Sequence, residues 1–303
     1  MTGAGATGGF FGARLAGAGR DVTFLVRPAR AALLRERGLR VVGLGGTETI
    51  SPRLATAPEI TGPYDVVLLA LKATALAQAL DDLAPAIGPD TMILPFLNGL
   101  AHLDVLNQRF GEKAVLGGVV KVATTVNDDG DIVQLAPLAS VSLGEQDGPI
   151  SERVRGVAAS LGQAGFDVDV RADIIAAMWH KWVFIATAGA LTCLMRGTVG
   201  DIAAVPGGPG LAEAILAEAA AVAAAAGFPV PDGELAATRA TMTQAGSSFA
   251  SSMYRDVAAG RPTEAEQILG DLTARARARS VSTPRLDLAT LHLRVYERRL
   301  GLA

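Results

Sequence analysis

The sequence has little of several residue types that would each indicate a particular class of protein. A single cysteine, Cys193, excludes a disulfide framework and fits a reducing compartment. Three histidines, His102, His180 and His292, are too widely separated to indicate a metal site. The net charge of −3 gives no sign of a nucleic-acid-binding surface. The apolar runs are short or interrupted by charge and no signal peptide is recognised, so we expect a cytoplasmic protein without a membrane span.

Lysine is scarce as well, although basic residues are not. Only four of the 27 basic residues are lysine, namely Lys72, Lys113, Lys121 and Lys181. This chain uses arginine wherever any cation suffices, so each remaining lysine is a better candidate for a role that needs lysine itself.

Glycine is abundant, and its most informative cluster opens the chain. Gly3, Ala4, Gly5, Ala6, Thr7 and Gly8 form a dinucleotide-binding fingerprint. The first glycine permits a tight turn, the second lets the backbone approach a pyrophosphate, and the third lets a helix pack close to a strand. The helix that follows offers its free N–H groups and positive dipole end to the phosphates.

The strand that should lead into this fingerprint is missing, because only Met1 and Thr2 precede Gly3. The first strand of a Rossmann sheet is central, and both neighbours need its hydrogen bonds. We therefore expect the native start to lie about half a dozen residues upstream, roughly one strand length. For a chain that begins at Met1, the expectation is weak cofactor binding and low stability.

The rest of the pattern predicts two domains, 1–170 and 171–303. Strands and helices alternate in the first, which indicates an α/β fold, a Rossmann-type doubly wound sheet with its first strand truncated. Its strands are expected at 21–26, 39–44, 48–55, 65–71, 91–96, 114–125, 132–135, 140–143 and 167–170. The second domain is expected to be all-α, with helices at 172–196, 209–226, 232–244, 247–259, 264–279 and 284–300.

The second strand indicates which dinucleotide is bound. A site for NADH usually has Asp or Glu at the end of this strand, to bind the ribose 2′-hydroxyl. Here the strand ends in Val26-Arg27-Pro28-Ala29-Arg30, and a guanidinium can clamp a 2′-phosphate. Arg27 therefore predicts NADPH. Arg30 is a second candidate, and either arginine could instead be a solvated loop residue.

Further motifs, in order and spacing, make nearly the whole chain resemble the ketopantoate reductase (2-dehydropantoate 2-reductase) family. Each motif alone is weak, but the ordered set is fairly specific. The motifs are Leu71-Lys72, Leu97-Asn98-Gly99, Trp179-His180-Lys181-Trp182, Gly200-Asp201-Ile202, Ser251-Ser252-Met253 and Arg261-Pro262-Thr263-Glu264. The resemblance implies a Rossmann domain and a helical domain with the active site in the cleft between them, and a small 2-oxo acid as substrate.

The resemblance also implies roles for single residues. Lys181 matches the family's proton donor, and hydride attack on a carbonyl does build alkoxide charge that an ammonium can stabilise and protonate. Glu264 matches a carboxylate near the nicotinamide and the lysine. Asn98 matches an amide near cofactor and substrate, Lys72 a cofactor contact, and Ser252 a hydroxyl that binds the substrate carboxylate.

Each of these five positions also has a purely structural interpretation. Lys181 and Lys72 could be solvated lysines at helix ends, and Glu264 could complement a helix dipole. Asn98 could serve an Asn-Gly turn, and Ser252 could cap a helix or lie on the surface.

The sequence departs from the family pattern in the substrate cradle. The family commonly carries asparagines four and eight residues after the catalytic lysine, where this chain has Ile185 and Gly189, and it can carry asparagine where this chain has Val199 and Phe249. An apolar pocket discriminates only weakly in favour of a substrate hydroxyl. We therefore expect a 2-oxo acid or related carbonyl that is bulkier or less hydroxylated than ketopantoate.

Two other functions fit parts of the sequence. A hydroxyacid or opine dehydrogenase has a similar layout, but no histidine lies in a motif that suits an acid. The only candidate is His180, and its neighbour Lys181 matches better. A non-enzymatic NADPH-binding sensor would explain the lost asparagines but not Lys181 and Glu264. The apolar C-terminal helices permit a homodimer without requiring one.

Overall fold

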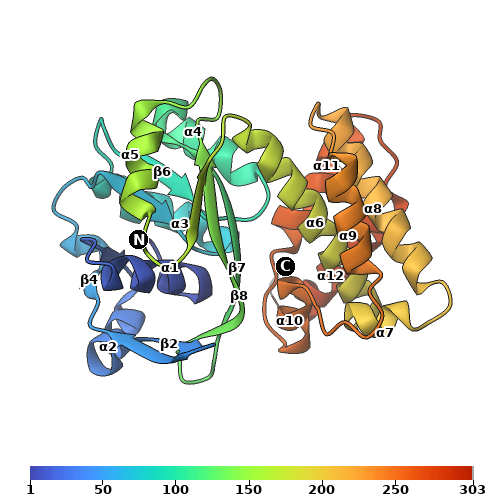
Figure 1. The fold of residues 1–303 in the computed structure, drawn as a ribbon, viewed down its shortest axis with the longest axis horizontal. Coiled ribbons are helices and arrows are strands. Elements are labelled where there is room, and N and C mark those ends of the chain that lie inside the picture. The colour runs from blue at the N-terminus through green and yellow to red at the C-terminus, as the bar shows by residue number, and fades with distance from the viewer. Residues whose placement is uncertain (302–303) are drawn as a thin grey trace. The chain divides into compact units, whose positions relative to one another are not determined.

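The computed structural model describes residues 1–301 and divides into two compact units (Figure 1). The first unit comprises Met1–Leu97 and His102–Ile175. The second comprises Asn98–Ala101 together with the chain from Ala176 onward. The short Asn98–Ala101 segment thus belongs with the helices, although β-structure of the first unit leads directly into it.

The first unit contains a parallel sheet made of two strand pairs. Strand β1 (Thr23–Leu25) pairs with β4 (Arg53–Ala55), and β5 (Val66–Leu69) pairs with β6 (Met92–Pro95). Strand β5, predicted at 65–71, has the apolar sequence Val66-Val67-Leu68-Leu69, which suits a strand buried on both faces.

Residues 1–3 lie between these two pairs, in the central position of the sheet. Thr2 bridges Leu25 on one side and Leu69 on the other, both in parallel. Its N–H donates to the carbonyl of Leu68 at 2.8 Å, and its carbonyl accepts from the N–H of Ala70 at 3.0 Å. The short segment before the fingerprint therefore occupies the place of a central strand, with one β-bridge on each side of Thr2.

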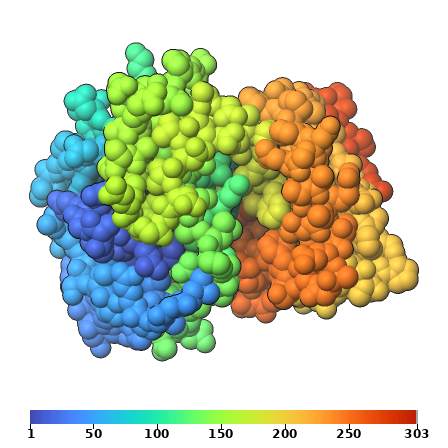
Figure 2. All heavy atoms as spheres, in the orientation of Figure 1, coloured from blue at the N-terminus to red at the C-terminus, as the bar shows by residue number. Residues whose placement is uncertain are grey.

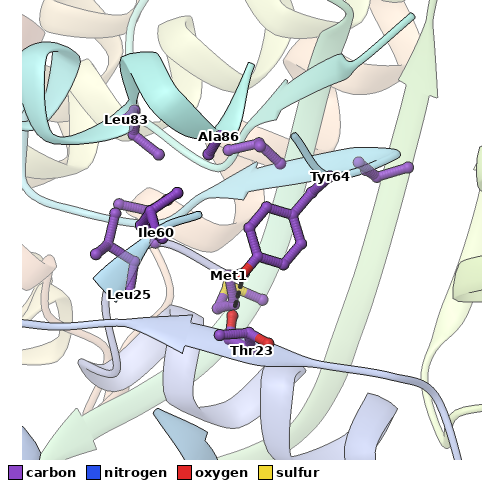
Figure 3. Close-up of a pocket in the computed structure, with 10 residues that line it drawn as sticks. Met1, Thr23, Leu25, Ile60, Tyr64, Leu83 and Ala86 are labelled. Carbon is purple, nitrogen blue, oxygen red and sulfur yellow. Dashed lines mark hydrogen bonds between the residues drawn. The ribbon is translucent and has the colours of Figure 1, made fainter. Parts of the chain in front are cut away.

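A hollow lies beside Met1 and is lined by residues of β1 and β5, among others (Figure 3). Figure 3 shows the side chain of Tyr64 next to Met1 in this hollow. The lining residues come from both strand pairs and the turns around them: Met1, Thr2, Thr23, Leu25, Ile60, Tyr64, Val66, Val67, Leu83 and Ala86.

A second, mixed sheet completes the β-structure of this unit. The long strand β8 (Ile132–Gly144) pairs antiparallel with β7 (Gly117–Val126) along one edge. Along its other edge it pairs in parallel, first with β2 (Leu39–Gly43) and then with β9 (Asp167–Val170). Strand β3 (Gly46–Ile50) forms a hairpin with β2.

Helix α1 (Ala6–Gly17) packs against strands of both sheets, and its small residues make this possible. A Cβ on Gly12 would collide with the ring of Phe24 on β1, and a Cβ on Gly9 would collide with Ile132 on β8. In Figure 2 the dark-blue atoms of α1 adjoin the yellow-green atoms around α5, where Arg20 donates to the carbonyls of Ser160 and Gly162. The other α-helices of the unit are α2 (Pro28–Arg37), α3 (Leu76–Leu83), α4 (Ala101–Phe110) and α5 (Glu152–Leu161).

The second unit is helical, as predicted. Its elements are α6 (Ile174–Met195), α7 (Val199–Ala203), α8 (Gly208–Ala225), α9 (Asp232–Met242), α10 (Ser252–Ala258), a π-helical turn η5 (Glu266–Gly270), α11 (Asp271–Ala278) and α12 (Pro284–Arg299). The buried carboxylate of Glu218 on α8 accepts from the N–H groups of Arg285 and Leu286, and so caps α12. Burial in α6 raises the pKa of Cys193 to about 12, which keeps this thiol protonated.

Helices α6 and α8 are both long and apolar enough to cross a membrane, judged by length and composition alone. In α6, 61% of the 18-residue apolar stretch is buried inside the structure, which suits a core helix of the second unit. The predicted architecture, a Rossmann-type α/β unit followed by an all-α unit, is confirmed.

Candidate active site

The fingerprint has the geometry of a phosphate-binding turn. Gly3 has a φ of +91°, and a Cβ on it would lie 2.5 Å from the carbonyl oxygen of Ala70. A Cβ on Gly8 would collide with the carbonyl of Gly3, whereas a Cβ on Gly5 would meet nothing within 4 Å. The first and third glycines therefore serve close packing, and the second leaves the backbone open to a ligand.

The N-terminus of α1 suits an anion because its N-cap residue has no side chain to compete for the free N–H groups. Its N-cap is Gly5, no side chain accepts from the first N–H groups, and its first turn carries no acidic residue. These N–H groups, together with the helix dipole, can hold a pyrophosphate. Ala4, Ala6 and Thr7 complete the turn.

The two candidate arginines for a 2′-phosphate have different surroundings. Arg27 is the N-cap residue of α2 and is exposed at the end of β1. Arg30 is half-buried, and one of its terminal nitrogens donates to the carbonyls of Ala4 at 2.9 Å and Gly130 at 3.0 Å. Arg30 therefore braces the fingerprint turn against the β7–β8 hairpin, which leaves Arg27 as the phosphate candidate.

Lys72 lies in the first unit, three residues after the end of β5. It is exposed and is the N-cap residue of the short 3₁₀ turn Ala73–Ala75. Its position at a carboxyl end of the parallel sheet is where ligands of open α/β sheets bind.

In the second unit, the three predicted polar residues Lys181, Asn98 and Glu264 form one hydrogen-bonded chain. The Lys181 ammonium donates to Oδ1 of Asn98 at 3.0 Å. Nδ2 of Asn98 donates to Oε2 of Glu264 at 3.1 Å. All three side chains are half-buried. Lys181 and Glu264, which lie 83 and 166 positions after Asn98 in the sequence, thus both bind its amide.

The chemistry of the partners fixes the orientation of the Asn98 amide. An ammonium only donates and a carboxylate only accepts, so the amide oxygen must face Lys181 and the nitrogen must face Glu264. The amide consequently links a cation to an anion, and it holds the ammonium in a defined position.

Ser252 is exposed at the first position of α10. The N-cap of that helix is its neighbour, Ser251, whose hydroxyl accepts from the N–H of Tyr254 at 3.0 Å. Ser251 is buried and forms a 2.8 Å hydrogen bond with Thr192 of α6. The capping role considered for Ser252 therefore belongs to Ser251, and Ser252 is exposed to solvent.

The four positions that could carry asparagine all hold residues without a polar side chain, and they are together called the apolar region. Ile185 and Gly189 follow Lys181 at intervals of four on α6, so they share its face. The space beside Gly189 is filled by Met253, whose terminal methyl a Cβ on Gly189 would strike. The half-buried Phe249 packs against Phe184 with ring centroids 6.0 Å apart.

Val199 supports this region through its backbone. It is fully buried at the start of α7, and its N–H donates to the carbonyl of Phe249 at 2.9 Å. Within residues 1–301, no group of three or more His, Cys, Asp or Glu side chains is arranged to hold a metal ion.

A fingerprint of this geometry in a Rossmann-type unit, followed by an all-helical unit, defines a pyridine-nucleotide-dependent oxidoreductase. Residues 1–148 match the family model described as ketopantoate reductase PanE/ApbA, and residues 173–297 match the model of its C-terminal domain. The chain belongs to the ketopantoate reductase family.

Individual relatives agree with this assignment. The chain is 33% identical to an uncharacterized oxidoreductase, YkpB, of Bacillus subtilis over 98% of both chains. It is 31% identical to a 2-dehydropantoate 2-reductase of Mesorhizobium japonicum over 94% of this chain and 93% of that one. A 2-dehydropantoate 2-reductase structure from Geobacter metallireducens superposes with a TM-score of 0.88 at 30% identity, covering 97% of this chain and 98% of that chain.

The fold is shared more widely. A D-mandelate dehydrogenase in complex with NADH and anilino(oxo)acetate superposes with a TM-score of 0.90 at 22% identity, over the full length of both chains.

Proposed function

We propose that this protein reduces a 2-oxo acid to a 2-hydroxy acid with NADPH, in the manner of a 2-dehydropantoate 2-reductase. The observation that carries the proposal is the Lys181–Asn98–Glu264 hydrogen-bonded chain. The family membership supplies the reaction class, and the 2-dehydropantoate 2-reductase from Mesorhizobium japonicum is a relative that carries this activity in its name.

The bound cofactor supplies a hydride, and the protein manages the charge that hydride transfer creates. As the carbonyl carbon of the substrate is reduced, its oxygen gains negative charge, which the Lys181 ammonium stabilises and then protonates. Arginine could not replace it as a proton donor, because a guanidinium does not readily release a proton.

Asn98 and Glu264 keep this acid in place. The Asn98 oxygen holds the ammonium at 3.0 Å, and the Glu264 carboxylate fixes the amide from its other end at 3.1 Å. The carboxylate also places a negative charge near the ammonium, which favours the charged, proton-donating form of lysine.

The preference for NADPH rests on Arg27. It is exposed at the end of β1, where a carboxylate would be expected in a site for NADH. A guanidinium there can bind a 2′-phosphate with paired, charge-assisted hydrogen bonds. The fingerprint residues 3–8, Lys72 and Asn98 are the other proposed cofactor contacts, and Ser252 is proposed to bind the substrate carboxylate.

The apolar region after Lys181 favours a substrate with few hydroxyl groups. Ile185, Phe249 and the methyl of Met253 offer no hydrogen-bond partner to a hydroxyl on the substrate's side chain. We infer that the substrate is bulkier or less hydroxylated than ketopantoate. The 2-oxo acid part of the substrate is inferred to be the same as in ketopantoate, because Lys181 and Ser252, the residues proposed to contact it, are both present.

Two compounds test the substrate directly. Ketopantoate and 3,3-dimethyl-2-oxobutanoate differ by one hydroxyl group. We expect kcat/KM for the dehydroxy compound to equal or exceed that for ketopantoate. A site built to bind the hydroxyl would prefer ketopantoate by about 10⁴-fold or more, and that result would refute the inference.

Lys181→Ala tests the reaction itself. We expect turnover to fall by about 10²–10⁴-fold, as for loss of a general acid, while NADPH binding persists. Lys113→Ala, on the short Glu112–Ala114 turn of the first unit, is the matched control and should leave turnover unchanged. Unchanged turnover in Lys181→Ala would remove this residue from the mechanism. A wild-type protein that binds NADPH but reduces no carbonyl would instead be a sensor.

A cytoplasmic homodimer is the proposed form of the enzyme. Leu288, Leu291 and Val295 form an exposed apolar stripe on α12, with 51–57% of each residue accessible. A second copy of the chain could cover this stripe. Light scattering on the wild type and on Leu291→Glu tests this point, and a monomeric wild type would refute it.

A further inference from the structure

Trp182 follows Lys181 directly and is fully buried behind the Lys181–Asn98–Glu264 chain. Its indole Nε1 donates a 2.8 Å hydrogen bond to the carbonyl of Ile268. Ile268 lies in η5, the π-helical turn that begins two residues after Glu264. The indole N–H therefore binds the backbone of the segment that carries Glu264, the proposed active-site carboxylate.

The π-helical turn explains why this backbone needs outside partners. Such turns are rare, interrupt the regular hydrogen bonding of an α-helix, and occur frequently at functional sites. Here the Ile268 carbonyl accepts from Trp182, and the Gly270 carbonyl accepts from the hydroxyl of Thr273 at 3.0 Å. The Ile268 N–H donates to the carbonyl of Glu264, so the turn is continuous with the carboxylate residue.

The Asn98–Gly99 turn packs against the same place. Gly99 has a φ of +75°, and a Cβ on it would lie 2.6 Å from the carbonyl oxygen of Gln267 and 3.9 Å from Cε2 of Trp182. This close approach requires glycine. One indole consequently contacts or adjoins the three segments that carry Lys181, Asn98 and Glu264.

We propose that Trp182 is a positioning residue, whose indole N–H holds η5 so that Glu264 and Lys181 meet the two ends of the Asn98 amide. The inference rests on the proposed function for its catalytic meaning. If the hydrogen bond is lost, the π-helical turn loses a partner for a buried carbonyl and can relax toward regular helix. The Glu264 carboxylate then shifts relative to Asn98.

The position of the indole ring does not depend on this hydrogen bond. The Arg275 guanidinium lies over the rings of both Trp182 and Trp179, at 5.6 and 5.9 Å from their centroids. Arg275 in turn is paired with Asp271 at 3.1 Å. Trp179 stacks on Phe228 on its other side. Phenylalanine at position 182 would keep a ring in this stack and remove only the N–H.

Trp182→Phe therefore tests the proposal, with Trp179→Phe as the control. Both remove one indole from the same stack, but the structure gives the Trp179 side chain ring contacts only. We expect kcat of Trp182→Phe to fall by about 10- to 100-fold, with the KM for NADPH nearly unchanged, because a small displacement suffices for such a loss. Trp179→Phe should keep kcat close to the wild type at a similar loss of thermal stability.

Amide hydrogen exchange of residues 264–270 gives a readout that does not need turnover. We expect faster exchange there in Trp182→Phe than in Trp179→Phe. If the wild type reduces no 2-oxo acid, the proposed function fails and exchange alone decides the role of Trp182. If both variants show the same kcat and the same exchange, the inference is wrong although the proposed function stands.

Thr273→Val supplies the test if Trp182→Phe does not fold. It removes the donor to the Gly270 carbonyl of the same turn without touching the aromatic stack. We expect faster exchange of residues 264–270 and a lower kcat with little change in KM. Wild-type values for both would overturn the inference.

Discussion

The ammonium of Lys181 donates a hydrogen bond to the amide oxygen of Asn98 at 3.0 Å. The two residues are 83 positions apart and both belong to the second unit, where Asn98 lies in the short segment Asn98–Ala101 and Lys181 lies on α6. Asn98 belongs with the helices because its short segment packs on the backbone of η5. An amide at this place can bind a cation through its oxygen and an anion through its nitrogen at the same time.

Replacing Asn98 should separate these two tasks. Asn98→Ala removes both hydrogen bonds, and we expect kcat to fall by about 10²-fold, equivalent to roughly 3 kcal/mol of transition-state stabilisation. Asn98→Asp keeps an acceptor for Lys181 but sets a carboxylate against Glu264. We expect Asn98→Asp to regain activity when combined with Glu264→Gln. Steady-state kinetics on the three variants measure this, and no gain in the double variant would contradict the linked arrangement.

Arg27 and Arg30 should differ in their effects on cofactor choice. Arg27→Ala removes the proposed 2′-phosphate ligand, so we expect the KM for NADPH to rise by about 10-fold or more, as for a lost charge-assisted pair, with the KM for NADH unchanged. Arg30→Ala instead frees the fingerprint turn from the hairpin and should weaken both cofactors. Titration of each variant with NADPH and NADH distinguishes the two, and equal losses in Arg27→Ala would count against NADPH specificity.

Gly200 and Gly189 offer a matched pair of helical glycines. A Cβ on Gly200 would lie 2.5–2.8 Å from backbone atoms of Ser247 and Gly246, which cannot move away singly. We expect Gly200→Ala to lower the free energy of unfolding by about 2 kcal/mol, through overpacking. In Gly189→Ala the new methyl meets only the flexible end of Met253, and helix propensity offsets about 1 kcal/mol. Denaturant unfolding of both variants checks the contrast, and equal losses would contradict it.

In a chain that begins at Met1, the buried terminal amine predicts a pH dependence of stability. Burial lowers the pKa of the Met1 amine from 8.0 to about 5. Between these values the unfolded state binds a proton that the folded state does not, so stability rises as pH increases from 5 to 8. The full difference is up to about 4 kcal/mol, from roughly three pKa units.

Urea unfolding at pH 5.5 and pH 7.5 measures this dependence. The control is the same protein with an acetylated N-terminus, which cannot titrate and should lose this part of the slope. If the acetylated and free proteins show the same slope, the amine does not cause it.

Local sequence signals predicted most elements, and the exceptions have identifiable physical causes. Two separate strands were predicted at 132–135 and 140–143, yet β8 is continuous from Ile132 to Gly144 and includes Pro137. The register between β7 and β8 shifts between Val122 and Thr124, and Pro137 lies in the stretch of β8 opposite this irregularity. A missing N–H costs nothing there, because the ladder is already interrupted.

The segment before α10 is not helical, although its local sequence favoured a helix. A helix was predicted over 247–259, but α10 begins at Ser252. The carbonyls of Ser247 and Phe249 accept from the N–H groups of Gly200 and Val199, so this stretch is extended and caps α7. Thr198 and Asp201 form a capping box that marks the start of α7 in the sequence, and this signal could have predicted that helix.

In the candidate site, some residues could be predicted from the sequence, whereas the roles of others depend on the three-dimensional structure. Residue chemistry and motif order picked out Lys181, Asn98 and Glu264, which the structure brings together. The supporting role of Trp182 depends on a π-helical turn that has no simple local pattern. The task of Arg30 depends on a carbonyl of a hairpin 100 residues away, so the sequence could not separate it from Arg27.

The two β-bridges made by Thr2 have a consequence for the dynamics of the first unit. The few backbone hydrogen bonds of residues 1–3 connect the β1–β4 pair to the β5–β6 pair. A seam this short can open without unfolding either pair, so the amide protons of Thr2, Leu25 and Ala70 should exchange faster than those inside each pair. The fingerprint turn begins at the same seam. Cofactor that holds this turn should therefore slow exchange across the whole parallel sheet, so that ligand and sheet stabilise each other.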